Sequence, residues 1–190
     1  MCIRDSVNAW YPGESGGKAV AEVLFGDYNP GGRLPLTYYR SLDELPPFDD
    51  YDITKGRTYK YFKGDVLYPF GYGLSYTTFK YSNLQVADGE EEINVSFQLK
   101  NSGKYAGDEV AQVYVKLPER DEIMPIKELK GFERVTLKSG ENKKVTLKLR
   151  KDLLRYWDEA KDKFVCPSGD YTIIVCLLYT SPSPRDLSTS

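Results

Sequence analysis

The 190-residue sequence predicts a mainly-β protein, in which a two-sheet β-sandwich follows a short α/β segment and a long aromatic-rich connector. Three observations predict this fold class. Short runs after residue 79 alternate apolar and polar residues, as half-buried strands do. Clusters rich in Gly, Ser, Asn and Asp separate these runs. Before residue 40, by contrast, apolar residues repeat once at helical spacing.

Residues 7–40 are interpreted as the closing piece of an α/β unit. The apolar segment "VNAWY" leads into a glycine turn, and the Ser15 hydroxyl is expected to cap a helix. Gly26 is expected to end that helix. Its apolar face comprises Ala19, Val20, Val23 and Leu24. After it, "DYNPGGR" predicts a turn and "LPLTYY" a short extended segment.

Residues 41–78 form an aromatic- and Gly-rich connector without a sustained period. A loop this long inside a compact protein is usually functional or packed across a neighbouring element. Its many aromatic residues argue against a flexible linker, because linkers are polar and poor in aromatics. We therefore expect the connector to be packed.

Residues 79–175 are predicted to form an all-β domain. The run "INVSFQLKN" places Ile93, Val95, Phe97 and Leu99 on one face. The same alternation recurs in three further sets: Ala111, Val113, Val115 and Leu117; Val145, Leu147 and Leu149; and Tyr171, Ile173 and Val175. Several short strands with intervening turns indicate an immunoglobulin-like or fibronectin type III-like sandwich.

The two ends of the sequence are explained by one short DNA element. A DNA sequence that encodes residues 1–6 also encodes "CLLYT", the start of residues 176–190, when its opposite strand is read in a suitable frame. Both ends are interpreted as translated sequencing adapter, to be excluded from fold reasoning. A natural N-terminus and a Pro/Ser-rich tail are the alternative. On the adapter interpretation Cys166 is the remaining cysteine, and no disulfide framework is expected.

Charge and composition exclude several function classes. The net charge of −2 argues against a nucleic-acid or anionic-membrane partner, and no apolar run is long enough to span a bilayer. The sequence contains no histidine, which removes the usual base of a serine triad and every histidine metal ligand. No metal site and no cofactor are predicted.

The letters "GESGG" match the nucleophile-elbow pattern G-x-S-x-G, with Ser15 as the nucleophile. An elbow needs a base, and the chain offers no histidine. A serine esterase using Ser15 is therefore the less favoured interpretation, and a glycine turn into a helix explains the same letters.

Other polar residues have structural explanations as well. Asp49, Asp50 and Asp52 cluster in the connector, but clustering does not place two carboxyls across a sugar ring. Connector aromatics with Arg57, Lys60 and Lys63 could stack on bases, yet the acidic balance makes nucleic acid a poor partner. Cys166 is expected to be a small buried residue.

Four ordered segments resemble the C-terminal part of glycoside hydrolase family 3. They are "AWYPGESGGKAVAEVLFGDYNPGGRLPLTYY", "GRTYKYFKGDVLYPFGYGLSYTTFKYSNL", "GDEVAQVYVKLP" and "KELKGFERVTLKSGENKKVTLKL". The resemblance implies the end of an α/β-sandwich domain, a connector and a fibronectin type III-like domain. It also implies a retaining exo-β-glycosidase, β-xylosidase rather than β-glucosidase, that acts on oligosaccharides in the periplasm or outside the cell.

In that family the catalytic Asp and Glu precede these motifs, so no catalytic residue is assigned here and the chain alone is expected to be inactive. Glu14 occupies a turn where the family carries no catalytic acid, and Ser15 is expected to be structural. Tyr59, Tyr61 and Phe62 are the candidates for lining the sugar cleft, with packing at a domain interface as the alternative. The upstream catalytic domains would be partners within the same chain. A free-standing carbohydrate-binding sandwich is the other function class, although a self-contained module would not begin with a lone strand-turn-helix.

Overall fold

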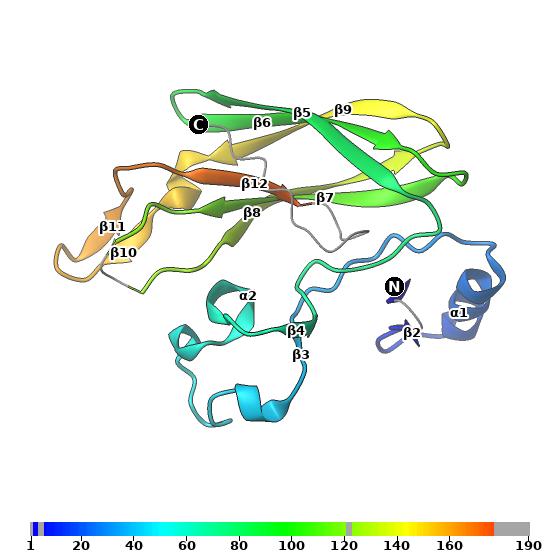
Figure 1. Ribbon diagram of the computed structural model, residues 1–190, viewed down its shortest axis with the longest axis horizontal. Coiled ribbons are helices and arrows are strands. Elements are labelled where there is room, and N and C mark those ends of the chain that lie inside the picture. The colour runs from blue at the N-terminus through cyan, green and yellow to red at the C-terminus, as the bar shows by residue number, and fades with distance from the viewer. Residues whose placement is uncertain (1, 4–5, 121–122, 177–190) are drawn as a thin grey trace.

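The computed structural model describes residues 2–3, 6–120 and 123–176, and its main body is a β-sandwich of two three-stranded antiparallel sheets (Figure 1). One sheet has the order β5-β6-β9 and the other the order β12-β7-β8. The strands of the first sheet are β5 (Phe79–Asp88), β6 (Glu92–Asn101) and β9 (Asn142–Arg150). Those of the second are β7 (Gly107–Lys116), β8 (Glu128–Leu137) and β12 (Thr172–Cys176). The predicted fold class is confirmed.

The core lies between the two sheets and follows the alternation in the sequence. On β6, Val95 and Phe97 pair with Leu147 and Val145 of β9, and all four side chains are buried. Ala111, Val113 and Val115 of β7 are fully buried on the opposing sheet. Burying a Val, Leu or Phe side chain stabilises the fold by roughly 1.5–3 kcal/mol. The strand alternation therefore assigned the core face correctly.

Several elements of the domain lie outside the predicted runs. Strands β5 and β8 complete the two sheets, and β12 includes Cys176, one residue beyond the predicted boundary. A separate hairpin pairs β10 (Tyr156–Asp158) with β11 (Lys163–Val165), after a short 3-10 helix η3 (Lys151–Leu154). At the N-terminal end, the adapter interpretation covers β1 (Cys2–Ile3), which pairs with β2 (Ser6–Val7). At the C-terminal end, it covers residues 177–190, which lie outside the described part of the chain.

Helix α1 (Gly16–Phe25) is the helix predicted in the N-terminal segment. It ends at Gly26, whose φ of 85° is the left-handed conformation that glycine adopts without strain. Ser15 stands at the N-cap position, but the predicted hydroxyl cap is wrong. Its φ of −87° and ψ of 12° lie outside the extended region that a capping side chain needs, and no side-chain cap bond forms. The turn is made by the backbone instead, with Gly16 N–H donating to the Gly13 carbonyl at 2.9 Å.

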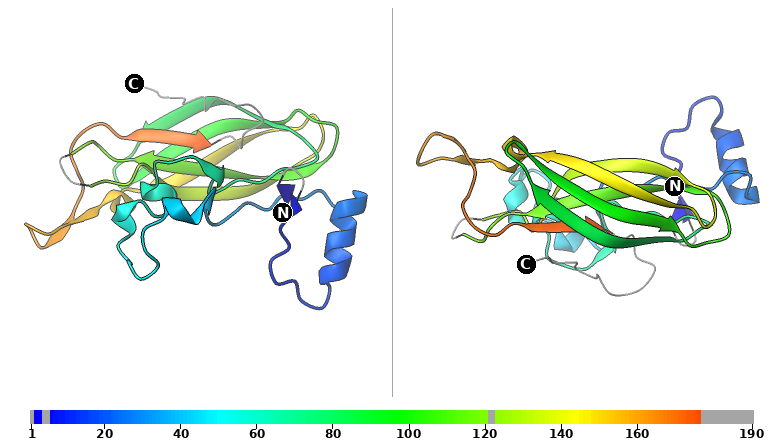
Figure 2. Two further views of the ribbon diagram at one scale, coloured as in Figure 1. Left: turned by 60° about the horizontal axis from the view of Figure 1, so that its bottom comes forward. Right: turned by 90° about the horizontal axis from the view of Figure 1, so that it is seen from above.

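The connector is folded, although none of its elements is long. Its strand β4 (Val66–Tyr68) pairs with β3 (Tyr38–Tyr39) at the end of the N-terminal segment. Between them lie the 3-10 helices η1 (Leu42–Glu44) and η2 (Ile53–Lys55) and the one-turn helix α2 (Thr58–Tyr61). In Figure 2 these elements lie against one face of the sandwich, on the side that also carries α1. The expectation of a packed connector is borne out by its contacts with β7.

Candidate functional site: the interface of the connector with the sandwich

Strand β7 is buried on both faces, which sets it apart from the other strands. The inner face carries the core residues, while Gln112 and Tyr114 on the outer face are only 4% and 2% exposed. The connector covers them. Gln112 Nε2 donates to the Gly71 carbonyl at 3.2 Å, and the Tyr114 hydroxyl donates to Gln112 Oε1 at 2.6 Å. A buried amide that meets a backbone carbonyl in this way fixes where the connector lies.

Gly71 is required by this contact. Its φ is +81°, and a Cβ atom built there would stand 2.3 Å from Gln112 Oε1 and 2.9 Å from the Tyr114 hydroxyl. On its other side, the Gly71 N–H donates to the Leu34 carbonyl at 2.7 Å, and the Leu34 N–H donates to the Tyr72 carbonyl at 2.8 Å. The N-terminal segment, the connector and β7 are thus joined at one point.

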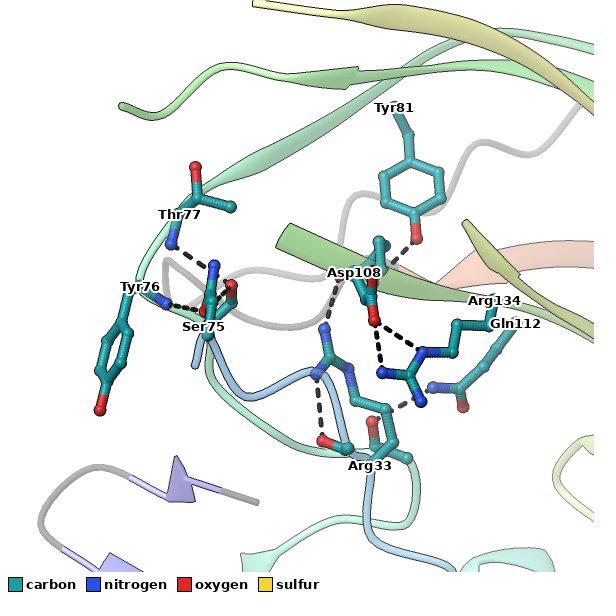
Figure 3. A network of polar contacts seen from close by, with 12 residues as sticks. Arg33, Ser75, Tyr76, Thr77, Tyr81, Asp108, Gln112 and Arg134 are labelled. Atoms are coloured by element: carbon teal, nitrogen blue, oxygen red, sulfur yellow. Dashed lines mark hydrogen bonds and ion pairs between the residues drawn. The ribbon is translucent and has the colours of Figure 1, made fainter. Parts of the chain in front are cut away.

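A buried ion pair joins the N-terminal segment to the interior of the sandwich (Figure 3). Arg33 Nη2 lies 2.5 Å from Glu109 Oε2, and the two side chains are only 7% and 3% exposed. Tyr81 on β5 donates its hydroxyl to the other carboxylate oxygen at 3.0 Å. Burial raises the pKa of Glu109 above its ordinary value, although the Arg33 charge and the Tyr81 hydrogen bond act in the opposite direction. This carboxylate is a structural anchor without access to a ligand.

A second ion pair lies on the outer face beside the first (Figure 3). Arg134 of β8 holds Asp108 through two hydrogen bonds, one of them from Nε at 2.8 Å, and also donates to the Tyr28 hydroxyl at 3.0 Å. The Thr136 hydroxyl donates to Asp108 Oδ1 at 2.6 Å. Burial alone would raise the pKa of Asp108, but the hydrogen bonds from Thr136 and Arg134 outweigh it and hold the pKa below its ordinary value.

Asn29 ties three segments together with one amide group. Its Nδ2 donates to the Ala106 carbonyl at 2.8 Å, at the start of β7. Its Oδ1 accepts from the Ser75 hydroxyl at 2.9 Å and from the Tyr76 N–H at 2.8 Å. The Tyr76 hydroxyl in turn donates to the Val23 carbonyl of α1 at 2.5 Å. The sequence predicted only a turn for "DYNPGGR", so the anchoring role of Asn29 and Arg33 was missed.

The three predicted sugar-lining residues lie in and beside α2, in different surroundings. Tyr59 stacks on Phe70 with ring centroids 4.2 Å apart, and its hydroxyl accepts from the Leu129 N–H at 3.0 Å. Phe62 packs edge-on against Tyr39 of β3 at 4.8 Å. Tyr61 is half-buried, and burial raises its pKa. Tyr59 thus contacts the sandwich, and Phe62 contacts the end of the N-terminal segment. Their part in lining a cleft stays a prediction.

One cavity lies away from these three aromatics. It measures about 430 Å³ and lies between α1 and the chain segments 7–12 and 28–32. Its lining is largely apolar and includes Val20, Val23 and Pro30. Arg134 reaches it from the sandwich. Among the residues that line this cavity, Glu22 carries the single carboxylate.

The connector carboxylates order their own loop. Asp50 Oδ2 pairs with Lys55 at 2.7 Å, and this hydrogen bond lowers the pKa of Asp50. Asp52 caps η2 by accepting from the Thr54 N–H at 3.0 Å and from its hydroxyl at 2.6 Å, which lowers the pKa of Asp52. A general acid at neutral pH needs a raised pKa, so neither residue is suited to that role.

Cys166 corrects one further expectation. Its side chain is exposed rather than buried, and the residue directly follows β11, which belongs to the separate hairpin. Its Sγ lies 3.1 Å from the Tyr171 hydroxyl, which donates to the Pro167 carbonyl at 2.6 Å. Across residues 2–3, 6–120 and 123–176 no group of three or more His, Cys, Asp or Glu side chains could hold a metal ion. In the same ranges no helix is long and apolar enough to cross a membrane.

Comparison with known proteins matches both parts of the chain to family models. Residues 3–76 match the glycosyl hydrolase family 3 C-terminal domain, and residues 109–177 match a fibronectin type III-like domain. The xylan 1,4-beta-xylosidase of Xylanibacter ruminicola is 45% identical over 183 residues, which cover 95% of this chain and 21% of that protein. The periplasmic beta-glucosidase of Salmonella typhimurium is 35% identical over 185 residues, covering 89% of this chain and 24% of that protein.

Solved structures agree with the sequence relatives. Beta-glucosidase 3B from Thermotoga neapolitana superposes with a TM-score of 0.82 at 33% identity, covering 95% of this chain and 26% of that one. The beta-D-glucoside glucohydrolase of Trichoderma reesei gives a TM-score of 0.80 at 32% identity, covering 92% and 28%. The chain therefore spans about a fifth to a quarter of the length of the proteins it matches.

Proposed function

Since the chain belongs to glycosyl hydrolase family 3, with that family's C-terminal domain followed by a fibronectin type III-like domain, we propose that it is the non-catalytic C-terminal part of a retaining exo-β-glycosidase. In this proposal the sandwich holds the connector in place beside the catalytic part of the longer enzyme. That enzyme acts on oligosaccharides. The chain by itself does not hydrolyse glycosides.

The main support for this proposal comes from the pKa shifts and bonding partners of the carboxylates. Retaining hydrolysis needs a nucleophilic carboxylate and a second carboxyl about 5–5.5 Å away that donates a proton. Asp50 and Asp52 have lowered pKa values and are engaged by Lys55 and Thr54. Glu109 has a raised pKa, but it is sealed between Arg33 and Tyr81. These surroundings support an anchoring role for each of them.

The relatives support a β-xyloside as the substrate of the longer enzyme. The Xylanibacter xylosidase is 45% identical, whereas the beta-glucosidases of Salmonella typhimurium and Aspergillus niger are 35% and 37% identical. A putative beta-xylosidase from Formosa agariphila is 37% identical, so identity alone gives a modest preference. The ratio of the rates at which the longer enzyme itself cleaves β-xyloside and β-glucoside decides between the two sugars.

The test compares the chain with a chimera. In the chimera this chain replaces the matching 183 residues of the Xylanibacter xylosidase. Both proteins are assayed with nitrophenyl β-xyloside and β-glucoside. We expect turnover by the chimera, whose catalytic residues come from the Xylanibacter part, and none by the chain alone. Turnover by the repurified chain that disappears in an Asp49→Asn, Asp50→Asn, Asp52→Asn variant would contradict the non-catalytic assignment.

One observation favours a second candidate, a carbohydrate-binding sandwich. Trp157 and Phe164 face each other across the β10–β11 hairpin, with ring centroids 5.2 Å apart, and are 48% and 64% exposed. Aromatic rings of this kind pack well against sugar rings. Sedimentation with insoluble xylan, compared with a Trp157→Ser, Phe164→Ser variant, tests it. Retention of the chain but not of the variant would support this candidate.

A further inference from the structure

Apolar side chains project into solvent from one part of the connector, residues 41–57, named here the 41–57 loop. Phe48 is 92% exposed, and Leu42 and Tyr51 are each 84% exposed. Single exposed apolar residues are ordinary, but three large ones gathered on one short loop mark an interaction surface.

The 41–57 loop is ordered by its own polar groups. Ser41 and Glu44 form a capping box around η1, in which the Ser41 hydroxyl accepts from the Asp43 N–H and the Glu44 carboxylate accepts from the Ser41 N–H. At the other end Arg57 Nη2 donates to the Pro47 carbonyl at 2.5 Å. A loop fixed in this way presents its apolar side chains without a further cost of ordering when a partner binds.

The placement of the loop indicates the side from which a partner comes. Figure 1 shows the cyan connector elements and α1 below the sandwich, away from β5, β6 and β9. Helix α1 also turns apolar residues outward on this side, with Leu24 and Phe25 64% and 84% exposed. The exposed apolar surface is thus concentrated on the segments that match the family 3 C-terminal domain, residues 3–76.

We propose that Leu42, Phe48 and Tyr51 of the 41–57 loop form a docking surface for the catalytic part of the same polypeptide. The proposal rests on the proposed function. The length of the relatives supports this occupant, because this chain covers only 21–24% of the xylosidase and beta-glucosidase relatives described above. The polar ordering of the loop fits a permanent contact within one chain, since Asp50 is held by Lys55, Asp52 by Thr54 and Glu44 by the Ser41 N–H.

Hydroxyl-radical footprinting of the isolated chain and of the chimera described above tests the surface directly. Phe48 and Tyr51 should be oxidised rapidly in the isolated chain and at least tenfold more slowly in the chimera. Trp157 and Phe164, on the β10–β11 hairpin, serve as the internal control and should react equally in both proteins. Equal oxidation of Phe48 and Tyr51 in the two proteins overturns the docking proposal, whether or not the chimera is active.

A triple variant of the chimera, Leu42→Ser, Phe48→Ser, Tyr51→Ser, adds a functional readout. Exposed side chains are replaced, so the sandwich itself should keep its thermal transition in the isolated chain. We expect the chimera variant to regain rapid oxidation at the neighbouring Ile53 and to inactivate on heating at least tenfold faster. A Val86→Ser, Leu153→Ser chimera, in which the replaced side chains are 38% and 45% exposed on β5 and η3, is the matched control and should behave like the parent. If the chimera is active and the triple substitution changes neither its oxidation nor its rate of inactivation, the docking surface is contradicted. If the chimera is inactive but Phe48 is protected, only the proposed function is contradicted.

Discussion

Arg33 is a charged residue held where an apolar residue would ordinarily stand, and its partner Glu109 is equally buried. Removing one member of a buried pair leaves the other charge without compensation, which costs about 3–5 kcal/mol. We expect Arg33→Met to lower the free energy of unfolding by this amount in urea titrations. The double variant Arg33→Met, Glu109→Leu should recover most of the loss, because it leaves no unpaired charge.

The control for this substitution is an exposed pair on the sandwich. Lys148 lies 3.4 Å from Glu92, with side chains 67% and 40% exposed. Lys148→Met should change the free energy of unfolding by less than about 1 kcal/mol, because exposed ion pairs contribute little. Similar losses for Lys148→Met and Arg33→Met would show that burial does not set the strength of the Arg33 contact.

Asp108 makes stability depend on pH. Its pKa is held below the ordinary value of 3.8, so the carboxylate binds protons less readily in the folded state than in the unfolded state. It therefore contributes stability that is fully present above pH 3.8 and is lost as the pH falls through the lower, folded-state pKa. The advantage of the native protein over Asp108→Asn should shrink as the pH falls below about 4. Urea titrations at several pH values measure it, and a constant difference would contradict the assigned contacts.

At the scale of elements, the connector and β7 depend on one close approach. A Cβ atom on Gly71 would collide with Gln112 and Tyr114 and would also occupy a strained backbone conformation. Gly71→Ala should therefore destabilise the protein by about 2–4 kcal/mol, combining overpacking with the left-handed strain. Gly26→Ala is the matched control. Its φ of +85° is similar but nothing lies within 4 Å, so strain alone, about 1–2 kcal/mol, should remain.

Thermal unfolding followed by circular dichroism ranks the two alanine variants. Hydrogen exchange in Gly71→Ala should also speed up at Leu34, whose N–H bonds to the connector. Equal destabilisation by Gly26→Ala and Gly71→Ala would mean that the connector can shift away from β7 without loss.

The sequence predicts best those strands in which apolar residues alternate with polar ones along the strand itself. Strand alternation located Val95, Phe97, Val113 and Val145 on the core face, because one inward face leaves a period-two pattern. It could not reveal that Tyr114 and Gln112 are covered as well, because their cover comes from Gly71 and its neighbours, far away in the sequence. Strands β10 and β11 are three residues each, too short for a period to be recognised.

At the scale of the whole molecule, the N-terminal segment and the connector cover part of the outer surface of the sandwich. We expect a fragment of residues 79–176 to unfold cooperatively, because the core cluster lies within it. Its melting temperature should be several degrees lower than that of the full chain, since Glu109, Gln112 and Tyr114 lose their cover. Calorimetry of the two proteins measures this. A fragment as stable as the full chain would show that the connector adds nothing to the sandwich.

The candidate site was predictable only in part at this scale. The resemblance placed the connector next to a sandwich and gave Tyr59, Tyr61 and Phe62 as candidates, and the structure adds that Tyr59 bonds to the backbone of β8. The Arg33–Glu109 pair had no local signal, because a single charge at the start of an alternating strand looks like an exposed residue. The absence of a catalytic role for the Asp cluster stays a prediction, and the structure adds that Asp50 and Asp52 hydrogen-bond within their own loop.

The contact between Arg33 and Glu109 also has a consequence for synthesis of the chain. The two residues are 76 positions apart. At about 5–20 residues per second, a ribosome takes roughly 4–15 s to add the residues between them. Throughout that interval Arg33 stays hydrated and the "NPGGR" segment has no strand to lie against. The N-terminal segment therefore finishes folding only after translation has passed β7, and a ribosomal pause between codons 40 and 105 would lengthen the wait without altering the folded product.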